Sequence, residues 1–197
     1  GKTHLLNNMV KSFIKADDAK GEFQQVVSWL GVTGEFFSRV VSVSYSAFDP
    51  FTPYEERTYP NYSYIGLKKV EAETTKSHND LAEEFFNSIN HCFSVGKKEK
   101  WINAVKSLES DPLFAEINIT QIVNNELNKE SIIKLFSRLS SGHSIVLLTI
   151  TKLVEKIEEK ALVLLDEPEA HLHPPLQSAF IRALSDLLIN RNAVAII

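Results

Sequence analysis

The strongest constraint in the sequence is a short apolar run that ends in two acids, ALVLLDE over residues 161–167. A continuous apolar run of this length is typical of a strand buried on both faces, as happens when helices cover a parallel sheet. Open α/β sheets bind ligands at the carboxyl ends of their strands. The run therefore predicts an α/β fold with Asp166 and Glu167 at a binding edge. The alternative is a core strand that ends in a charged turn.

An Asp-Glu pair at the tip of a buried strand is the Walker B pattern of nucleotide hydrolases. In this pattern the first acid holds Mg2+, directly or through water, and the second acid polarises the attacking water. The pattern predicts ATP and Mg2+ as cofactors, with Asp166 as a metal ligand and Glu167 as the catalytic residue.

A second motif, LSSGHS, stands shortly before this strand and leads into a helical apolar pattern. Ser140, Ser141, Gly142 and His143 then occupy a helix N-terminus, where free N–H groups, a hydroxyl and a small residue form a seat for an anion. A plain serine N-cap explains the motif equally well when it is taken alone. Its position before the two acids favours the anion seat.

The chain opens with Gly1-Lys2-Thr3, which is either the tail of a phosphate-binding loop or a chance tripeptide. The complete loop motif has another glycine farther upstream. The helical pattern THLLNNMVKSFI follows, so the tripeptide falls at a helix N-terminus, where phosphate binds well. With the other two motifs present, we expect Gly1, Lys2 and Thr3 to bind nucleotide, Lys2 at the β- and γ-phosphates and Thr3 as an Mg2+ ligand.

Both ends of the chain are expected to cut through structure. The front of the loop would precede Gly1, and the apolar run NAVAII at the other end has no terminating turn. We therefore expect the full-length protein to be an ATPase and the isolated 197 residues to be inactive.

Between these motifs the sequence divides into three parts. Helical spacing of apolar residues dominates 77–137, with Asn79 or Asp80 as the first N-cap. We expect this segment to be a helical lobe inserted between two parts of an α/β core, residues 1–76 and 138–197. In the core, RVVSVSYS and NYSYIGLK predict strands and NAVAII predicts a further buried strand.

The composition describes an ordinary globular protein, 44% hydrophobic and 23% charged, with a net charge of −4. Nothing in it indicates general binding to nucleic acid or anionic membrane, and the run from Lys97 to Lys100 favours a solvated turn over a nucleic-acid contact. The single cysteine, Cys92, excludes an internal disulfide. No apolar run approaches the ~20 residues that span a bilayer. We expect a cytoplasmic protein without a membrane partner.

Along the chain the tail of the phosphate-binding loop comes first, then the helical lobe, then the motif LSSGH and last the Asp-Glu pair. This order resembles that of ABC-type ATPase heads, in which a motif at the position of LSSGH is called the signature. DEPEAHLHP makes the chain most similar to the soluble branch with OLD-family, RecF-like and SMC-like ATPases. Within that branch, SYSAFDPF and YSYIGLK are similar to PtuA, the ATPase of Septu-type and retron-linked anti-phage systems. The resemblance implies a P-loop NTPase (ABC ATPase-like) core with an inserted helical lobe.

The resemblance also implies how such a head works. Two copies would close head-to-head as a homodimer around two ATP molecules, with the signature Ser140–His143 serving the ATP of the partner. His171 and His173 would lie in the D-loop region that touches the partner. The ATP cycle would drive an effector, expected to be an HNH-type nuclease in anti-phage defence, and nucleic-acid binding stays open.

Two details depart from the family pattern. The glutamine that ABC heads place after their second strand is not evident, so Asp49 stands there or the element is absent. His171 and His173 form a His-x-His pair that could suggest a metal, but the D-loop explains both and no third ligand is apparent in the sequence.

Three other functions compete with this one. A DNA-repair or chromosome-organising head would need long heptad tracts, which residues 77–137 cannot hold. HLHP argues against a transporter subunit, and Glu167 argues against a non-catalytic interaction module.

Overall fold

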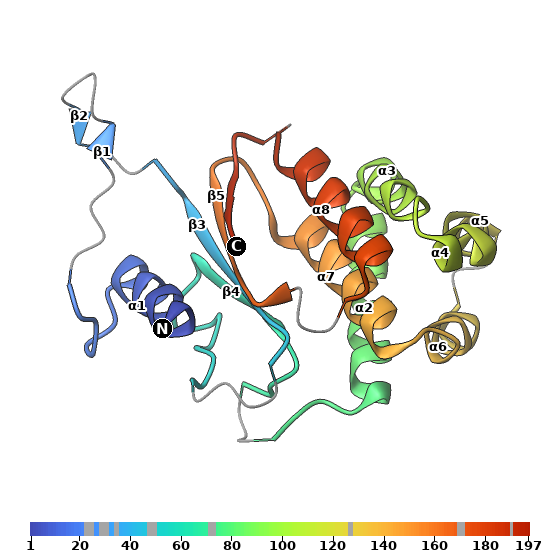
Figure 1. The fold of residues 1–197 in the computed structure, drawn as a ribbon, viewed down its shortest axis with the longest axis horizontal. Helices are drawn as coiled ribbons and strands as arrows, with labels where there is room; N and C mark the ends of the chain where they lie inside the picture. Colours follow the sequence, from blue (N-terminus) through green and yellow to red (C-terminus); the bar gives the residue numbers. More distant parts are fainter. Residues whose placement is uncertain are drawn as a thin grey trace.

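The computed structural model describes residues 1–21, 26–27, 32–33, 36–46, 51–70, 74–125, 128–168, 172–189 and 191–197. Its elements, in chain order, are α1 (Lys2–Ile14), β1 (Val26–Val27), β2 (Val32–Thr33), β3 (Arg39–Ser44), β4 (Tyr62–Gly66), α2 (His78–Ser94), α3 (Lys98–Leu108), α4 (Pro112–Ile117), α5 (Ile119–Asn125), α6 (Lys129–Ser137), α7 (Ser141–Lys156), β5 (Ala161–Asp166), α8 (Pro174–Ile189) and β6 (Val194–Ile196). Figure 1 shows α1 on one side of the main sheet and α2, α7 and α8 on the other, with α3 to α6 beyond them.

The main sheet has the strand order β4-β3-β5-β6, and all three strand pairs are parallel. The α/β core predicted from residues 161–167 is therefore confirmed. β5 is buried from Ala161 to Leu165, since helices cover both of its faces. Ser44 at the end of β3 pairs with Gly66 on one side and with Asp166 on the other. The carboxyl ends of three strands thus meet at one edge of the sheet.

The last strand differs from the prediction. NAVAII does form a strand, β6, but Val194 and Ile196 are 43% and 38% exposed. In the described part of the chain β6 is the edge of the sheet and pairs only with β5. A short apolar run does not distinguish an edge strand from a central one, which is why the predicted burial was wrong.

Each face of the sheet has its own apolar core. On one face Leu6 and Val10 of α1 pack with Val40 and Leu162. On the other face, the next residues along each strand join a larger core with α2, α3, α7 and α8. This division follows from the alternation of side chains along a strand. It also places the first turn of α1 beside the sheet edge that carries Asp166.

α7 is the central helix of the larger core. It is buried at every position from Gly142 to Thr151, because α2, α3 and α8 pack around it. A helix surrounded in this way is expected to be apolar on nearly all sides. Its burial holds the signature residues at its N-terminus in a defined place.

The helices of residues 77–137 join the same core rather than forming a separate one. The N-cap of α2 is Ser77, so the expectation of Asn79 or Asp80 was wrong. Ser77 Oγ accepts from the backbone N–H of Asp80 at 3.2 Å, and Asp80 Oδ2 accepts from the backbone N–H of Ser77 at 2.7 Å. Asp80 is the third residue of the helix, and its side chain reaches back to complete a capping box.

The contact between α3 and α7 gives a test of this core. Trp101 is fully buried, and its indole N–H donates to Thr151 Oγ1 at 2.9 Å. Thr151→Val keeps the shape but leaves that N–H without its acceptor, so we expect a loss of about 1–3 kcal/mol in unfolding free energy. Urea unfolding followed by tryptophan fluorescence measures it. The exposed Thr58→Val is the control, and equal stability of the two variants would contradict the prediction.

Candidate nucleotide site

Gly1, Lys2 and Thr3 lie at the N-terminus of a helix. α1 begins at Lys2 with Gly1 as its N-cap, and no side chain caps the first turn. The N–H groups of that turn therefore lack a capping acceptor, and together with the helix dipole they favour a bound anion.

Thr3 and Asp166 come together although they are far apart in the sequence. Both line a small cavity of about 30 Å3, together with Asn7 and Ser44. Two buried atoms of these residues, Asp166 Oδ1 and Asn7 Nδ2, have no hydrogen-bond partner among the described residues. Buried polar atoms are normally paired, because leaving one unpaired costs free energy. The carboxylate oxygen Asp166 Oδ1 therefore lacks a partner in this cavity, and a bound ligand could supply one.

The residues of this cavity fit Mg2+. Magnesium takes oxygen ligands, usually one or two from the protein, with waters and substrate phosphate completing the shell. Asp166 offers a carboxylate oxygen that has no partner among the described residues, and Thr3 offers a hydroxyl. The first turn of α1 starts beside them.

Tyrosines form part of the cavity wall. Burial is the main cause that raises the pKa of Tyr54 to about 12, and burial likewise raises the pKa of Tyr62. Burial disfavours the charged phenolate, so both side chains stay neutral at ordinary pH. The wall therefore adds no further negative charge beside Asp166.

Glu167 differs from its neighbour in exposure and backbone. Asp166 is half-buried and lines the cavity, whereas Glu167 is exposed. Glu167 has φ 47°, in the left-handed region that non-glycine residues rarely adopt. Such a backbone costs of order 1–3 kcal/mol, and Lys15, Asn118, Lys160 and Asn192 also adopt it. The strand tip thus separates the two carboxylates into different environments.

The signature residues form the start of α7. Ser140 is the N-cap, and its Oγ accepts from the backbone N–H of His143 at 3.4 Å. Ser140 and Ser141 are exposed, while Gly142 and His143 are buried. The side chains that face solvent at this helix N-terminus are therefore the two serines, and His143 turns inward.

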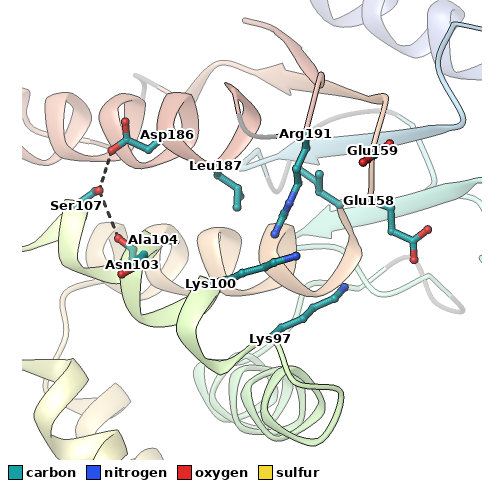
Figure 2. Close-up of a pocket in the computed structure, with 11 residues that line it drawn as sticks. Lys97, Lys100, Asn103, Ala104, Ser107, Glu158, Glu159, Asp186, Leu187 and Arg191 are labelled. Atoms are coloured by element: carbon teal, nitrogen blue, oxygen red, sulfur yellow. Dashed lines mark hydrogen bonds between the residues drawn. The ribbon is translucent and has the colours of Figure 1, made fainter.

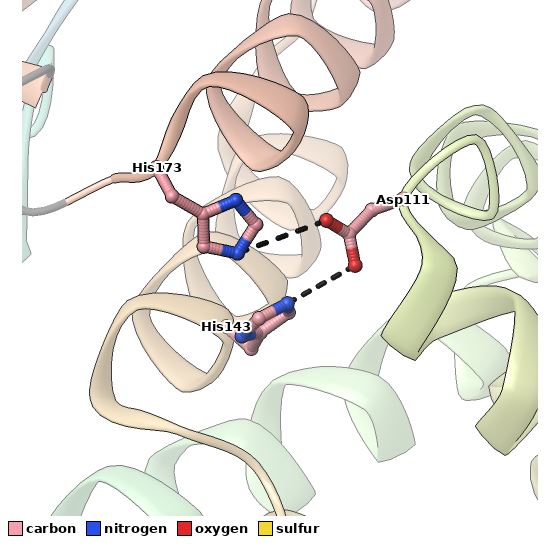
Figure 3. A group of neighbouring side chains, drawn as sticks. All are labelled: Asp111, His143 and His173. Atoms are coloured by element: carbon pink, nitrogen blue, oxygen red, sulfur yellow. Dashed lines mark hydrogen bonds and ion pairs between the residues drawn. The ribbon is translucent and has the colours of Figure 1, made fainter.

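His143 belongs to a group of three side chains from different elements, shown in Figure 3. Its Nε2 lies 3.0 Å from Asp111 Oδ1, and its Nδ1 lies 2.6 Å from Ser140 Oγ. His173 Nε2 lies 3.9 Å from the second oxygen of Asp111. Asp111 is the N-cap of α4 and is 1% exposed. One carboxylate thus ties the helical segment to the start of α7 and faces His173 before α8, while its Oδ2 has no hydrogen-bond partner among the described residues.

The group brings two further candidate metal ligands to His173, which the sequence did not reveal. The sequence shows no third ligand beside the His-x-His pair, but the structure brings Asp111, His143 and His173 within 4.8 Å of one another through their ligand atoms. Hydrogen bonds already account for much of the group, since Asp111 Oδ1 also accepts from the backbone N–H of Leu113 at 3.0 Å and His173 Nδ1 accepts from that of Leu176 at 3.3 Å. We assign it to positioning the helices.

Sequence reasoning missed two residues that matter here. Asp111 precedes a proline, which is a signal for a helix N-cap, but nothing local indicates that it meets His143. Asn7 has no local signal at all. His171 and Asp49, two residues of the sequence predictions, lie outside the described residues.

No helix in the described part of the chain is long and apolar enough to cross a membrane.

Comparisons with known proteins identify the family of the chain. A family model described as "AAA domain, putative AbiEii toxin, Type IV TA system" matches residues 32–197. The chain is 40% identical to Protein ea59 of Escherichia phage lambda, over its whole length and 42% of that protein. It therefore spans less than half the length of this relative. No solved structure matches the chain.

The match covers most of the chain, and the parallel sheet with helices on both faces is that of an α/β protein. The chain belongs to this family of AAA domains and has the α/β fold of a P-loop NTPase.

Proposed function

We propose that the full-length protein binds ATP with Mg2+ at the sheet edge where Thr3 and Asp166 meet, and hydrolyses it there. The observation that carries this proposal is the buried Asp166 Oδ1, which has no hydrogen-bond partner among the described residues and lies in the same cavity as Thr3. The magnesium ion would neutralise phosphate charge and orient the phosphates. Lys2 and the N–H groups of α1 would hold the β- and γ-phosphates.

Glu167 is proposed to orient the attacking water. It follows Asp166 directly and is exposed, so its carboxylate is free to accept a hydrogen bond from a water beside the bound phosphate. Its left-handed backbone turns the chain immediately after the metal ligand. This division of roles follows the different environments of the two acids.

The proposed active form is an ABC-type homodimer. Ser140 and Ser141 are exposed at the N-terminus of α7, where free N–H groups favour a phosphate from another molecule. His173 lies beside this N-terminus through Asp111, so the D-loop region and the signature form one face. Two copies would meet on that face, each signature completing the ATP site of the other.

The proposed output is control of an effector, a nuclease in anti-phage defence. Support comes from the resemblance to PtuA-type ATPases and from the family description, which names a toxin–antitoxin system. One relative, Protein ea59, is a phage protein. A chromosome-maintenance head is the alternative output for the same ATPase.

Glu167→Gln tests the catalytic assignment in the full-length protein. The amide keeps the size of the side chain but orients water poorly, so ATP turnover should fall by about 100-fold or more. ATP affinity, measured by calorimetry, should stay near that of the wild type. Glu116→Gln, an exposed position on α4, is the control and should leave turnover unchanged. Normal turnover in Glu167→Gln would refute the assignment.

Ser141→Asp tests the dimer. Aspartate suits the first turn of a helix, so α7 should remain stable. Its charge would oppose the partner's phosphate across a closed interface, where like charges cost several kcal/mol. In the Glu167→Gln background, ATP should still bind each monomer but should no longer produce dimers in light-scattering measurements. Ser141→Ala, which adds no charge, should retain most ATP-driven dimerisation.

Mixing two variants sharpens this test. Ser141→Asp and Lys2→Ala protomers together form one intact composite site, from the loop of the first chain and the signature of the second. Part of the ATP-dependent dimerisation should return in the mixture. If Ser141→Asp dimerises like the wild type, the serines only cap α7 and the head-to-head arrangement is wrong.

A further inference from the structure

A second pocket lies at the other end of the sheet from the nucleotide site. It has a volume of about 630 Å3 and is lined by Lys97 and α3, the connection from α7 to β5, the end of α8 and Arg191 beyond it. The connection precedes Ala161, the first residue of β5, while Asp166 is the last. The pocket therefore opens at the amino end of β5 and is separate from the proposed ATP site.

Three cations line this pocket, as Figure 2 shows: Lys97, Lys100 and Arg191. Arg191 is only 8% exposed, and its Nη1 has no hydrogen-bond partner among the described residues. Burial lowers the pKa of its guanidinium. A buried charge is normally paired because removal from water is costly. The guanidinium of Arg191 therefore lacks a negatively charged partner among the described residues.

The two lysines add to this imbalance. Lys97 Nζ donates to the backbone oxygen of Glu155 at 2.6 Å, which is a carbonyl and not a carboxylate. The pKa of Lys97 is lowered mainly by its burial, with repulsion from Arg191 and Lys100 adding to the effect and Cys92 and Glu158 opposing it. Lys100 is exposed at the rim. The charges of Lys97, Lys100 and Arg191 thus lie in one region of the pocket.

Three acids also line the pocket, Glu158, Glu159 and Asp186. Asp186 Oδ2 accepts from Ser107 Oγ at 2.9 Å, at the far end of the pocket in Figure 2. Glu158 and Glu159 are exposed to solvent. The carboxylate of Glu155, which does not line the pocket, contacts Lys152 and Lys156. In the described part of the chain, no carboxylate forms an ion pair with any of the three cations.

We propose that this pocket binds the phosphate group of a small phosphorylated ligand, such as a nucleoside monophosphate, independently of the ATP site. An arginine fork with two lysines is the donor set that recognises phosphate. The volume lies within the range of small-molecule sites, ~300–1,000 Å3. Arg191 is buried in the wall, where the backbone of a DNA duplex cannot reach it, so a small ligand fits better than nucleic acid.

The experiment uses the full-length Lys2→Ala protein, in which phosphate binding at the proposed ATP site is impaired. Calorimetry measures the affinity for inorganic phosphate and for AMP. Both should bind, and adding Arg191→Gln or Lys100→Gln should weaken each by about 10-fold or more, the effect of losing a charged hydrogen bond. Arg182→Gln, exposed on α8, and Lys98→Gln, outside the pocket, are the matched controls and should bind normally.

The outcomes separate the alternatives. Tighter binding of AMP than of phosphate supports a nucleotide ligand, and equal binding supports recognition of the phosphate group alone. The proposal is overturned if neither probe binds, if binding survives both substitutions, or if only a DNA duplex binds through Lys100. Because Lys100 is exposed, Lys100→Gln should fold even if Arg191→Gln does not. Unchanged MgATP binding by Arg191→Gln, measured with Lys2 intact, shows that the pocket and the ATP site are distinct.

Discussion

The pairing of β3 with β5 is the interaction on which the rest of the structure depends. It is parallel and in a register that sets Ser44 opposite Asp166. Parallel strands need crossover connections, so helices must cover both faces of the sheet. α1 takes one face and α7 with α8 takes the other. The acidic tip of β5, the start of α1 and the start of α7 are placed relative to one another through this one strand pair.

The buried carboxylate of Asp111 connects the helices of residues 77–137 to the helices that cover the sheet. It caps α4, contacts His143 at the start of α7 and faces His173 just before α8. A buried carboxylate holds its partners firmly, because losing any one of them leaves charge or polarity unpaired. Displacement of α4 would therefore be felt at the starts of α7 and α8, where the signature and the D-loop region are proposed to lie.

Each end of the sheet holds a buried polar atom that has no hydrogen-bond partner among the described residues. At the carboxyl end this atom is Asp166 Oδ1, and at the amino end it is Arg191 Nη1. Each is unfavourable in the protein alone and would be offset by a ligand of opposite charge. The same reasoning supports both proposals, a cation at Asp166 and an anion at Arg191, whereas Asp111 Oδ2, also without a hydrogen-bond partner in the described part of the chain, faces His173.

The sequence by itself determined the buried strand with its two acids, the helix starts at Lys2 and Ser141 and the strands on either side of β5. These depend on neighbours along the chain, since burial on both faces makes a run apolar and a helix start needs a local cap. Only the tertiary structure decided that Thr3 meets Asp166, that Asp111 joins His143 and His173, that Lys97 and Lys100 face Arg191, and that β6 is an exposed edge. Those contacts depend on strand order and helix packing. A single sequence contains no periodic pattern that reveals a contact between residues far apart along the chain.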